Sequence, residues 1–375
     1  MAGSADESSG GAARQVRRRV GDSWDLTLGT DFSGLDTPRL ALENLGFRVR
    51  QRFRCEVNQS CRRLLKQKWP EVDVEYGDIS QRDPSQVPQV ELYVAGVPCQ
   101  PWSSSGCQQG LHDRRGKLWA NALAYVGAQR PKAVVFENVK GLTGTKFKDV
   151  LKGILSTLDG YGYRHWHQVI DTCSHGIPQH RERIYIVAVR KDSGKAHFTW
   201  PTALPSPVPL RALLARDKCQ PGLPPESLKR GVARRKVVEA VQKLSSKDSS
   251  FDMSTRSLVV DIGCSANRVN YMTDRFPTLT ASRASVFGFY LVDQGRQLDL
   301  RDCFLLQGIS PNAYQYVEAG VSEQRVAHML GNCMSCNVLE RLLPLVLAMV
   351  DIFPSAPRRQ DPWEALGARF AASAP

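Results

Sequence analysis

Cys99 is the residue whose type and setting first suggest chemistry. It lies in the stretch AGVPCQPWSSSG, residues 95–106, where a run of apolar residues ends. Pro98 and Pro101 flank the cysteine, and a glycine stands on either side of the prolines, which favours a rigid, exposed loop. A buried cysteine usually serves as a small apolar side chain, whereas a thiol on an exposed loop is open to reaction.

Three roles are open to an exposed cysteine: metal ligand, redox thiol and nucleophile. The CxxC spacing occurs only at Cys333 and Cys336, far from Cys99 and without a second pair at zinc-finger spacing. Cys107 is eight residues from Cys99, which is too far for a dithiol motif. A nucleophile is therefore the best remaining interpretation of Cys99, and we expect no metal site.

Glu137 is the second candidate, because it lies in FENVKG, residues 136–141, at the end of another apolar run. A carboxyl group whose pKa is raised by burial can donate a proton or a hydrogen bond. Arg181 and Arg183 follow in GIPQHRERIYIVAV, where they supply positive charge that would stabilise a nearby thiolate. Each of these residues alone has an ordinary explanation as a polar residue at a strand end.

The elements that must position these residues alternate between strands and helices. Short runs rich in Val, Ile, Tyr and Phe predict strands at 26–32, 50–56, 89–97, 133–139, 164–170 and 183–189. Apolar residues three and four apart predict helices at 38–47, 60–69, 118–129 and 146–158. This alternation indicates an α/β fold with a parallel sheet covered on both faces, in which ligands bind at the carboxyl ends of the strands.

Composition divides the chain further. Residues 200–225 contain seven prolines, and residues 190–270 contain fifteen Lys and Arg against seven Asp and Glu, so we expect an irregular, basic insert there. The predicted segments are a disordered basic leader over 1–22, a main domain over 23–190, the insert over 191–270, a return to the main domain over 271–355 and a disordered tail over 356–375.

The net charge of +13 favours a polyanionic partner. The first 25 residues hold no apolar core of a secretory signal, and the longest apolar stretch, residues 338–353, is too short and too interrupted to cross a membrane. We therefore expect an intracellular protein without membrane contact, nuclear in a eukaryote and in the cytoplasm or nucleoid of a bacterium. Its ten cysteines should be mostly reduced.

Taken together, these segments resemble the cytosine C5-specific DNA methyltransferase family. VPCQPWS is similar to its nucleophile motif, FENV to its glutamate motif and QHRER to its paired-arginine motif. SSSGCQQGLHDRRGKLW resembles its mobile catalytic loop, and TDFSG, CEVN, GDI, RFPTLTASRA and HMLGNCMSCNVLE resemble further blocks in the same order. The resemblance covers nearly the whole chain, and nine ordered blocks make a chance match very improbable.

The resemblance implies a role for each catalytic candidate. The Cys99 thiolate would attack C6 of a cytosine while Glu137 protonates or hydrogen-bonds N3, so that C5 can accept a methyl group. Arg183 would hold the O2 edge of the base, with Arg181 beside it. The target cytosine would be flipped out of the DNA duplex, because a stacked base is out of reach of the cysteine.

The same resemblance implies S-adenosyl-L-methionine as methyl donor, bound on a Rossmann-like sheet with helices on both faces. The small insert would be a target-recognition domain that contacts DNA. The cofactor-binding residues would be Phe32, Ser33, Gly34, Leu35, Glu56, Asp78, Ile79, Pro98 and Asn332. We expect double-stranded DNA as the partner and a monomeric protein.

The stretch TDFSGLDTP departs from the family pattern. Members usually carry two glycines where this chain has Asp36 and Thr37, and an acid where it has Thr30. Glycines at such turns allow positive φ and close approach of the backbone to a ligand. An impaired DNA-binding relative is therefore one alternative to an active enzyme.

A tRNA cytosine-5 methyltransferase is the other alternative. One branch of the family modifies tRNA and shares a segment much like the ENVKG of this chain. That branch typically follows its cysteine with QPF, where this chain has QPW, and differs at the arginine motif. The sequence therefore favours DNA.

Overall fold

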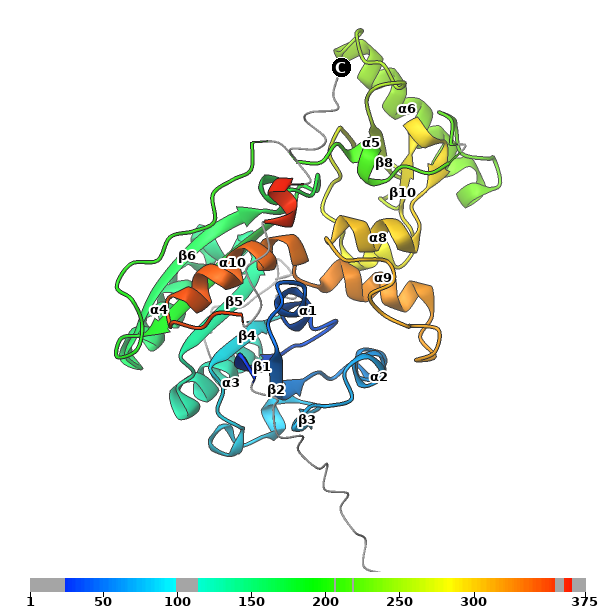
Figure 1. Ribbon diagram of the computed structural model, residues 1–375. Helices are drawn as coiled ribbons and strands as arrows, with labels where there is room; N and C mark the ends of the chain where they lie inside the picture. The colour runs from blue at the N-terminus through cyan, green and yellow to red at the C-terminus, as the bar shows by residue number, and fades with distance from the viewer. Residues whose placement is uncertain (1–23, 99–113, 206, 218, 355–360, 366–375) are drawn as a thin grey trace, which may run out of the picture.

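The computed structural model describes residues 24–98, 114–205, 207–217, 219–354 and 361–365. Within these ranges, seven strands form one large sheet in the order β3-β2-β1-β4-β5-β7-β6 (Figure 1). Their bounds are β1 Leu26–Asp31, β2 Val49–Cys55, β3 Val74–Tyr76, β4 Leu92–Gly96, β5 Ala133–Val139, β6 Tyr163–Asp171 and β7 Glu182–Arg190. The six strands expected from the sequence are all present, and β3 is an additional short strand at one edge.

The direction of β7 departs from the parallel sheet expected from the sequence. β3, β2, β1, β4 and β5 run parallel, but β7 is antiparallel to both of its neighbours, β5 and β6. Apolar composition reveals a strand without revealing its direction. The reversal places the start of β7 at the sheet edge where β4 and β5 end, with Arg183 opposite Val139.

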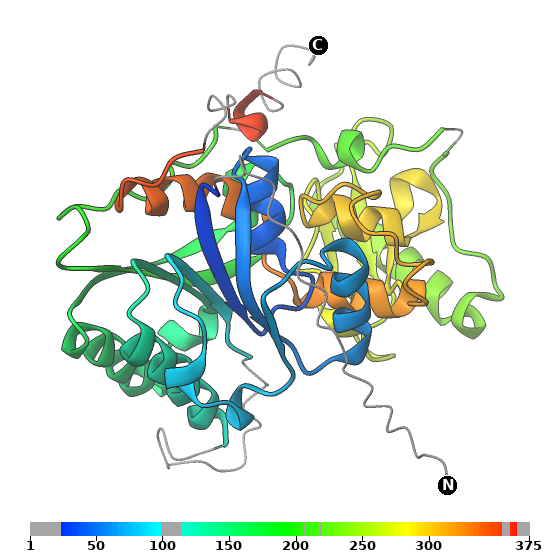
Figure 2. The same ribbon diagram turned by 60° about the horizontal axis from the view of Figure 1, so that its bottom comes forward.

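Helices cover both faces of this sheet. α1 Thr37–Asn44 and α10 Cys336–Ala348 lie against one face, and α3 Arg114–Gln129 and α4 Lys148–Gly160 lie against the other (Figure 2). Side chains of β4 alternate accordingly: Leu92 and Val94 belong to the core on the α1 and α10 side, and Tyr93 and Ala95 to the core on the α3 and α4 side. α2 Gln59–Lys68 joins β2 to β3. Asn58, the residue before it, caps the helix, because its side chain accepts hydrogen bonds from backbone amides of the first turn.

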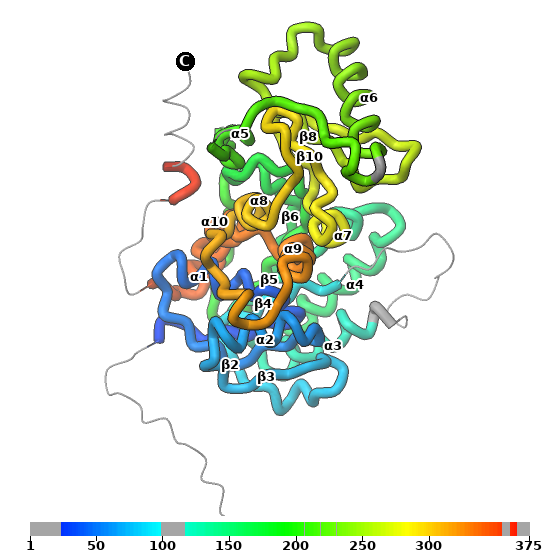
Figure 3. Tube along the Cα trace, turned by 90° about the vertical axis from the view of Figure 1, so that its right-hand side faces the viewer, coloured from blue at the N-terminus to red at the C-terminus, as the bar shows by residue number. Residues whose placement is uncertain are grey.

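A smaller antiparallel sheet forms a second unit at one end of the molecule (Figure 3). Its strands run in the order β11-β10-β8-β9, with bounds β8 Leu258–Asp261, β9 Tyr271–Thr273, β10 Phe289–Leu291 and β11 Arg296–Gln297. α6 Val232–Lys247 packs on this sheet through Ala233, Val237 and Ala240, and α5 Leu210–Leu213 precedes it. β8 precedes residue 270 and the other three strands follow it. The boundary at residue 270 between the insert and the main domain remains a prediction.

Three helices connect the two units: α7 Ala281–Ala284, α8 Leu300–Leu306 and α9 Glu323–Asn332. α9 lies so close to α7 that a Cβ atom on Gly331 would stand 2.4 Å from the backbone nitrogen of Ala281. Only glycine permits this approach, which brings the end of α9 to the edge of the large sheet. No helix within the described ranges is long and apolar enough to cross a membrane.

Candidate active site

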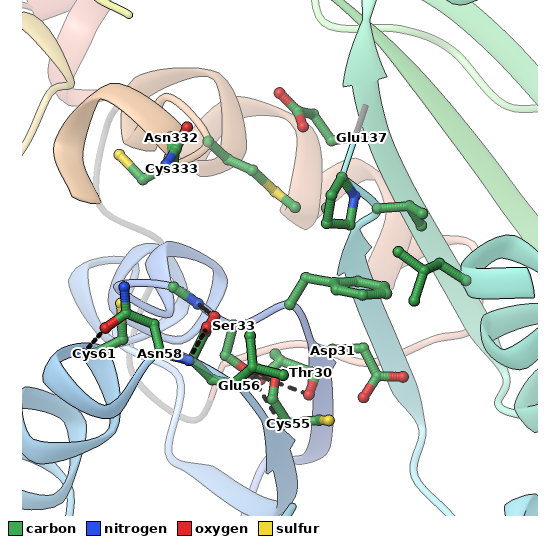
Figure 4. Close-up of a pocket in the computed structure, with 18 of the residues that line it drawn as sticks. Thr30, Asp31, Ser33, Cys55, Glu56, Asn58, Cys61, Glu137, Asn332 and Cys333 are labelled. Atoms are coloured by element: carbon green, nitrogen blue, oxygen red, sulfur yellow. Dashed lines mark hydrogen bonds between the residues drawn. The ribbon is translucent and has the colours of Figure 1, made fainter. Parts of the chain in front are cut away.

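A cavity of about 1050 Å³ opens at the carboxyl ends of β1, β2, β4 and β5 (Figure 4). The loop after β1, the starts of α1, α2 and β7, the turn after β3, the first part of α3 and the end of α9 complete its lining. The cavity collects nearly all of the described residues that the sequence singled out: Phe32, Ser33, Gly34, Glu56, Asp78, Ile79, Pro98, Glu137, Arg181, Arg183 and Asn332. It lies where the fold class predicts ligand binding.

The loop after β1 turns sharply under the cavity. Phe32, Gly34 and Asp36 have φ values of 54°, 54° and 53°, so every second residue adopts the left-handed conformation. The Ser33 amide donates to the carbonyl of Cys55 at 3.1 Å, which ties the loop to the end of β2. Leu35 is the exception among the predicted residues, because its side chain is fully buried in the core and does not line the cavity.

Two acidic residues face the cavity from the ends of β2 and β3. Glu56 accepts hydrogen bonds from the backbone amides of Gly34 and Asn58, each at 2.8 Å. The exposed Asp78 accepts from the amide and hydroxyl of Ser80, both at 2.9 Å through the same carboxylate oxygen. The other carboxylate oxygen of Asp78 has no hydrogen bond within the described part of the chain.

Glu137 lies on the opposite side of the cavity from Asn332, as Figure 4 shows. It lies near the end of β5, beside Gly96 of β4, and only 11% of its side chain is exposed. Its carboxylate contacts Nε of Arg183 at 3.3 Å. Burial raises the pKa of Glu137, and the opposing effect of Arg183 and Arg181 is smaller, so the carboxyl group is adapted to carry a proton.

The two arginines differ in environment. Arg181 is 2% exposed, and its terminal nitrogens donate to the carbonyls of Leu279, Gly331 and Cys333, the shortest bond being 2.7 Å to Cys333. Burial and the nearby Arg183 lower the pKa of Arg181 to about 10. Arg181 therefore holds the end of α9 in place, whereas Arg183, bound to Glu137, faces the cavity directly.

Cys99 lies outside the described residues. Pro98, directly before it, lines the cavity. The carbonyl of Val97 accepts a hydrogen bond of 3.0 Å from the side chain of Asn138, which neighbours Glu137. The structure thus fixes the end of β4 beside Glu137, at the point where the cysteine-containing loop begins.

Sequence reasoning missed a buried ion pair at the cavity. Asp31 forms two hydrogen bonds with Arg82 and accepts a third from the Tyr93 hydroxyl. The Arg82 guanidinium also lies 5.2 Å from the ring centres of both Phe53 and Tyr76. The one sign of this ion pair in the sequence is an acid, Asp31, inside the apolar run LTLGTDF. Arg82 lies in a polar stretch, where nothing distinguishes it from a solvated arginine.

Met334 and Asn138 are further cavity residues without a sequence signal. The Met334 methyl group would stand 3.0 Å from a Cβ atom on Gly96, so it covers the strand end next to Glu137. No cluster of His, Cys, Asp and Glu among the described residues has a geometry suited to a metal ion.

Known proteins resemble this chain in sequence and in fold. M.NgoBI of Neisseria gonorrhoeae, a Type II methyltransferase, is 29% identical over 333 residues, covering 88% of this chain and 95% of that protein. M.HgiCII of Herpetosiphon aurantiacus, another Type II methyltransferase, is 35% identical over 200 residues, which are 52% of this chain but only 44% of that protein. The methyltransferase EhMeth of Entamoeba histolytica shares the fold, with a TM-score of 0.60 at 17% identity over 86% of this chain and 98% of that chain.

A family model described as C-5 cytosine-specific DNA methylase matches residues 31–345. The match begins at the last residue of β1, runs through the second unit and ends within α10. Since it covers most of the sequence, the chain belongs to the C-5 cytosine-specific DNA methylase family.

Proposed function

We propose that this protein is a DNA cytosine-5 methyltransferase that acts on a flipped-out cytosine through a covalent bond between Cys99 and C6. The observation that carries the proposal is the buried Glu137 carboxyl group, paired with Arg183 in a cavity that also holds two acidic residues and the strand end before Cys99. Family membership sets the reaction class, and the residue roles are our inference.

The cavity fits S-adenosyl-L-methionine as methyl donor. Glu56 and Asp78 offer carboxylate oxygens to hydroxyl and amino groups of a nucleoside, and Phe32 and Ile79 offer apolar surface to its base. When bound, this cofactor supplies the methyl group that C5 accepts. Phe32, Ser33, Gly34, Glu56, Asp78, Ile79, Pro98 and Asn332 would hold it.

The protein residues act on the cytosine in our proposal. The sulfur of Cys99 forms a bond to C6, and the electron pair of the C5–C6 double bond becomes available at C5 while Glu137 donates a proton to N3. After C5 has gained its methyl group, it loses its proton to a base, the C5–C6 double bond forms again, the Cys99 thiolate leaves and the proton on N3 returns to Glu137. Arg183 would bind O2 of the cytosine and keep Glu137 oriented.

DNA is the polymer that we propose, with the second unit as its recognition surface. The excess of Lys and Arg in residues 190–270 suits contacts with phosphate groups. We propose that the protein acts as a monomer, since cavity, acid and arginines all come from one chain.

The test is incubation with labelled S-adenosyl-L-methionine and either duplex DNA or tRNA, in parallel with a Cys99→Ser variant. We expect label in DNA with the wild type and none with the variant. Label in tRNA alone would replace the DNA proposal by the tRNA activity. DNA binding without methyl transfer would identify an inactive DNA-binding relative.

Duplex DNA containing 5-fluorocytosine tests the covalent step separately. Fluorine at C5 cannot leave as a proton does, so the bond between sulfur and C6 persists and the complex survives denaturing electrophoresis. A complex that still forms with Cys99→Ser would remove Cys99 from the mechanism.

A further inference from the structure

After Gly34, the turn that follows β1 lacks the two glycines that the resemblance leads one to expect, and Asp36 occupies the first of their positions. Asp36 has a φ of 53°, a conformation that glycine adopts freely and that Asp tolerates better than most other residues. Its side chain is completely buried. The contacts that Asp36 makes inside the protein must therefore offset the free-energy cost of burying its carboxyl group.

Those contacts form a network below the cavity. One carboxylate oxygen of Asp36 accepts hydrogen bonds from the side-chain amide of Gln51 and, at 3.4 Å, from the hydroxyl of Thr30. The same Gln51 amide group donates to Thr30 at 3.1 Å, and its carbonyl oxygen accepts from Arg39 at 3.0 Å. Gln51 thus uses its donors and its acceptor together, with Asp36 as one partner.

The network reaches the cavity through two side chains of the loop. The Thr30 and Ser33 hydroxyls lie 2.9 Å apart, and both residues line the cavity. The Ser33 hydroxyl accepts from the Cys55 amide at 3.2 Å, beside the strand end that presents Glu56. Asp36, which does not line the cavity, is therefore connected to the residues that do.

We infer that Asp36 is a positioning residue for cofactor binding: its hydrogen bonds to Gln51 and Thr30 hold the Phe32–Leu35 loop in the shape that receives S-adenosyl-L-methionine. This inference rests on the proposed function. A glycine would provide the backbone conformation alone, whereas Asp36 provides both the conformation and an anchor. The departure from the family pattern is then an alternative way to build the same loop.

The network has one unsatisfied atom. The second carboxylate oxygen of Asp36 is buried without a hydrogen-bond partner among the described residues. Such an atom is costly to bury. Its presence in the fold supports a specific task for this acid, since an apolar or glycine residue would avoid the cost.

The test measures equilibrium binding of S-adenosylhomocysteine by calorimetry to four proteins: wild type, Asp36→Gly, Asp36→Asn and Gln51→Met. Asp36→Gly keeps the left-handed conformation and removes the anchor, so we expect the Kd to rise about tenfold, which corresponds to the loss of about one buried hydrogen bond. Asn tolerates the same conformation and its carbonyl oxygen accepts from Gln51, so Asp36→Asn should stay within about threefold of wild type. Gln51→Met should match Asp36→Gly.

The double variant Asp36→Gly/Gln51→Met shows whether the two residues affect cofactor binding through one network or independently. If the two residues act together, its Kd equals that of either single variant, and if they act separately the effects multiply. Asp293→Ala is the control, because this buried acid supports β8 through Leu258 and Ser257 far from the cavity. It should lower the Tm and leave the Kd unchanged.

A second readout distinguishes positioning from a role in the reaction. With DNA saturating, KM for S-adenosyl-L-methionine should rise in Asp36→Gly while kcat stays close to wild type. Wild-type affinity in Asp36→Gly, or a loss in Asp36→Asn equal to that in Asp36→Gly, would overturn the inference while leaving the proposed function intact. A wild-type protein that binds no S-adenosylhomocysteine would overturn both.

Discussion

Glu137 shows how the fold adapts one carboxyl group to acid chemistry. Because its side chain lies at a strand end between β4 and β7, water has little access to it, and burial raises its pKa. Arg183 opposes that effect and also fixes the orientation of the carboxylate. The ion pair keeps the Glu137 carboxyl group oriented toward the cavity while its pKa stays raised.

The first prediction concerns the pH dependence of the reaction. A raised pKa keeps Glu137 protonated to a higher pH than an ordinary glutamate, and the protonated fraction falls as pH rises through that pKa. The rate of adduct formation with 5-fluorocytosine DNA should therefore decline on the alkaline side of the Glu137 pKa. Glu137→Gln should lower the rate about 100-fold or more and remove this decline, as measured by quenched-flow electrophoresis over a pH series.

A group that must lose a proton to react, such as an attacking thiol, gives the opposite limb of the profile and so does not mimic this decline. An alkaline decline that persists in Glu137→Gln would assign that limb to another group.

Arg181 leads to the second prediction, which concerns stability. It is buried and donates to backbone carbonyls on two segments, near α7 and at the end of α9. Arg181→Ala leaves these carbonyls without a donor, so the free energy of unfolding should fall by about 3 kcal/mol. Chemical denaturation measures this loss, and Arg190→Ala, which removes a partly exposed guanidinium at the far end of β7, should cost much less.

At the scale of elements, the turn after β3 depends on the buried pair of Asp31 and Arg82. Both side chains are almost fully buried, at 0% and 4% exposure, and the aromatic rings around Arg82 exclude water. Arg82 lies four residues after Asp78 in the same turn. The pair therefore anchors the segment that presents Asp78 and Ile79 to the cavity.

The third prediction follows from that anchor. Arg82→Met leaves the Asp31 carboxylate buried without a cation, which is strongly destabilising, and should increase hydrogen exchange in residues 77–86. Adding Asp31→Asn removes the uncompensated charge and should restore part of the Tm. Equal exchange in Arg82→Met and wild type would show that the segment is held by other contacts.

Most of the strands and helices could be predicted from the sequence, and the features that could not be predicted have physical reasons. Apolar periodicity is a local property, so it predicts six strands and four flanking helices, and the ordered motifs contain residues that line the cavity, from Phe32 to Asn332. The direction of β7 escaped because strand polarity is set by long-range pairing. The contacts of Arg82 and Asp36 escaped because a buried charge and a solvated one look alike in a sequence.

At the scale of the molecule, much of the positive charge of the second unit is neutralised within the fold. Arg211, Arg216, Arg234, Lys243 and Arg256 each form an ion pair with a carboxylate. Arg235 on α6 and Arg268 after β8 are exposed and form no ion pair within the described ranges. Arg235 donates to the carbonyl of Ala266, so Arg235 lies beside the segment that carries Arg268.

The fourth prediction assigns phosphate contacts to that surface. Arg235→Gln and Arg268→Gln should each weaken DNA binding and reduce the slope of log K against log salt concentration by about 1. Arg256→Gln is the control, because its guanidinium is already paired with Asp248 and Asp274. Fluorescence anisotropy over a salt series measures both quantities, and an unchanged slope would place the DNA on another face.

The packing of α1 against α10 has a consequence for how the chain is made. Asn44, the last residue of α1, donates to Glu340 on α10 at 2.7 Å across 296 residues of sequence. During synthesis α1 therefore emerges long before α10, and the part of the sheet face that α10 covers stays open until α10 has been made. The second unit, whose contacts are closer in sequence, can fold in that interval, so the ribosome completes the part proposed to hold DNA before the part proposed to modify it.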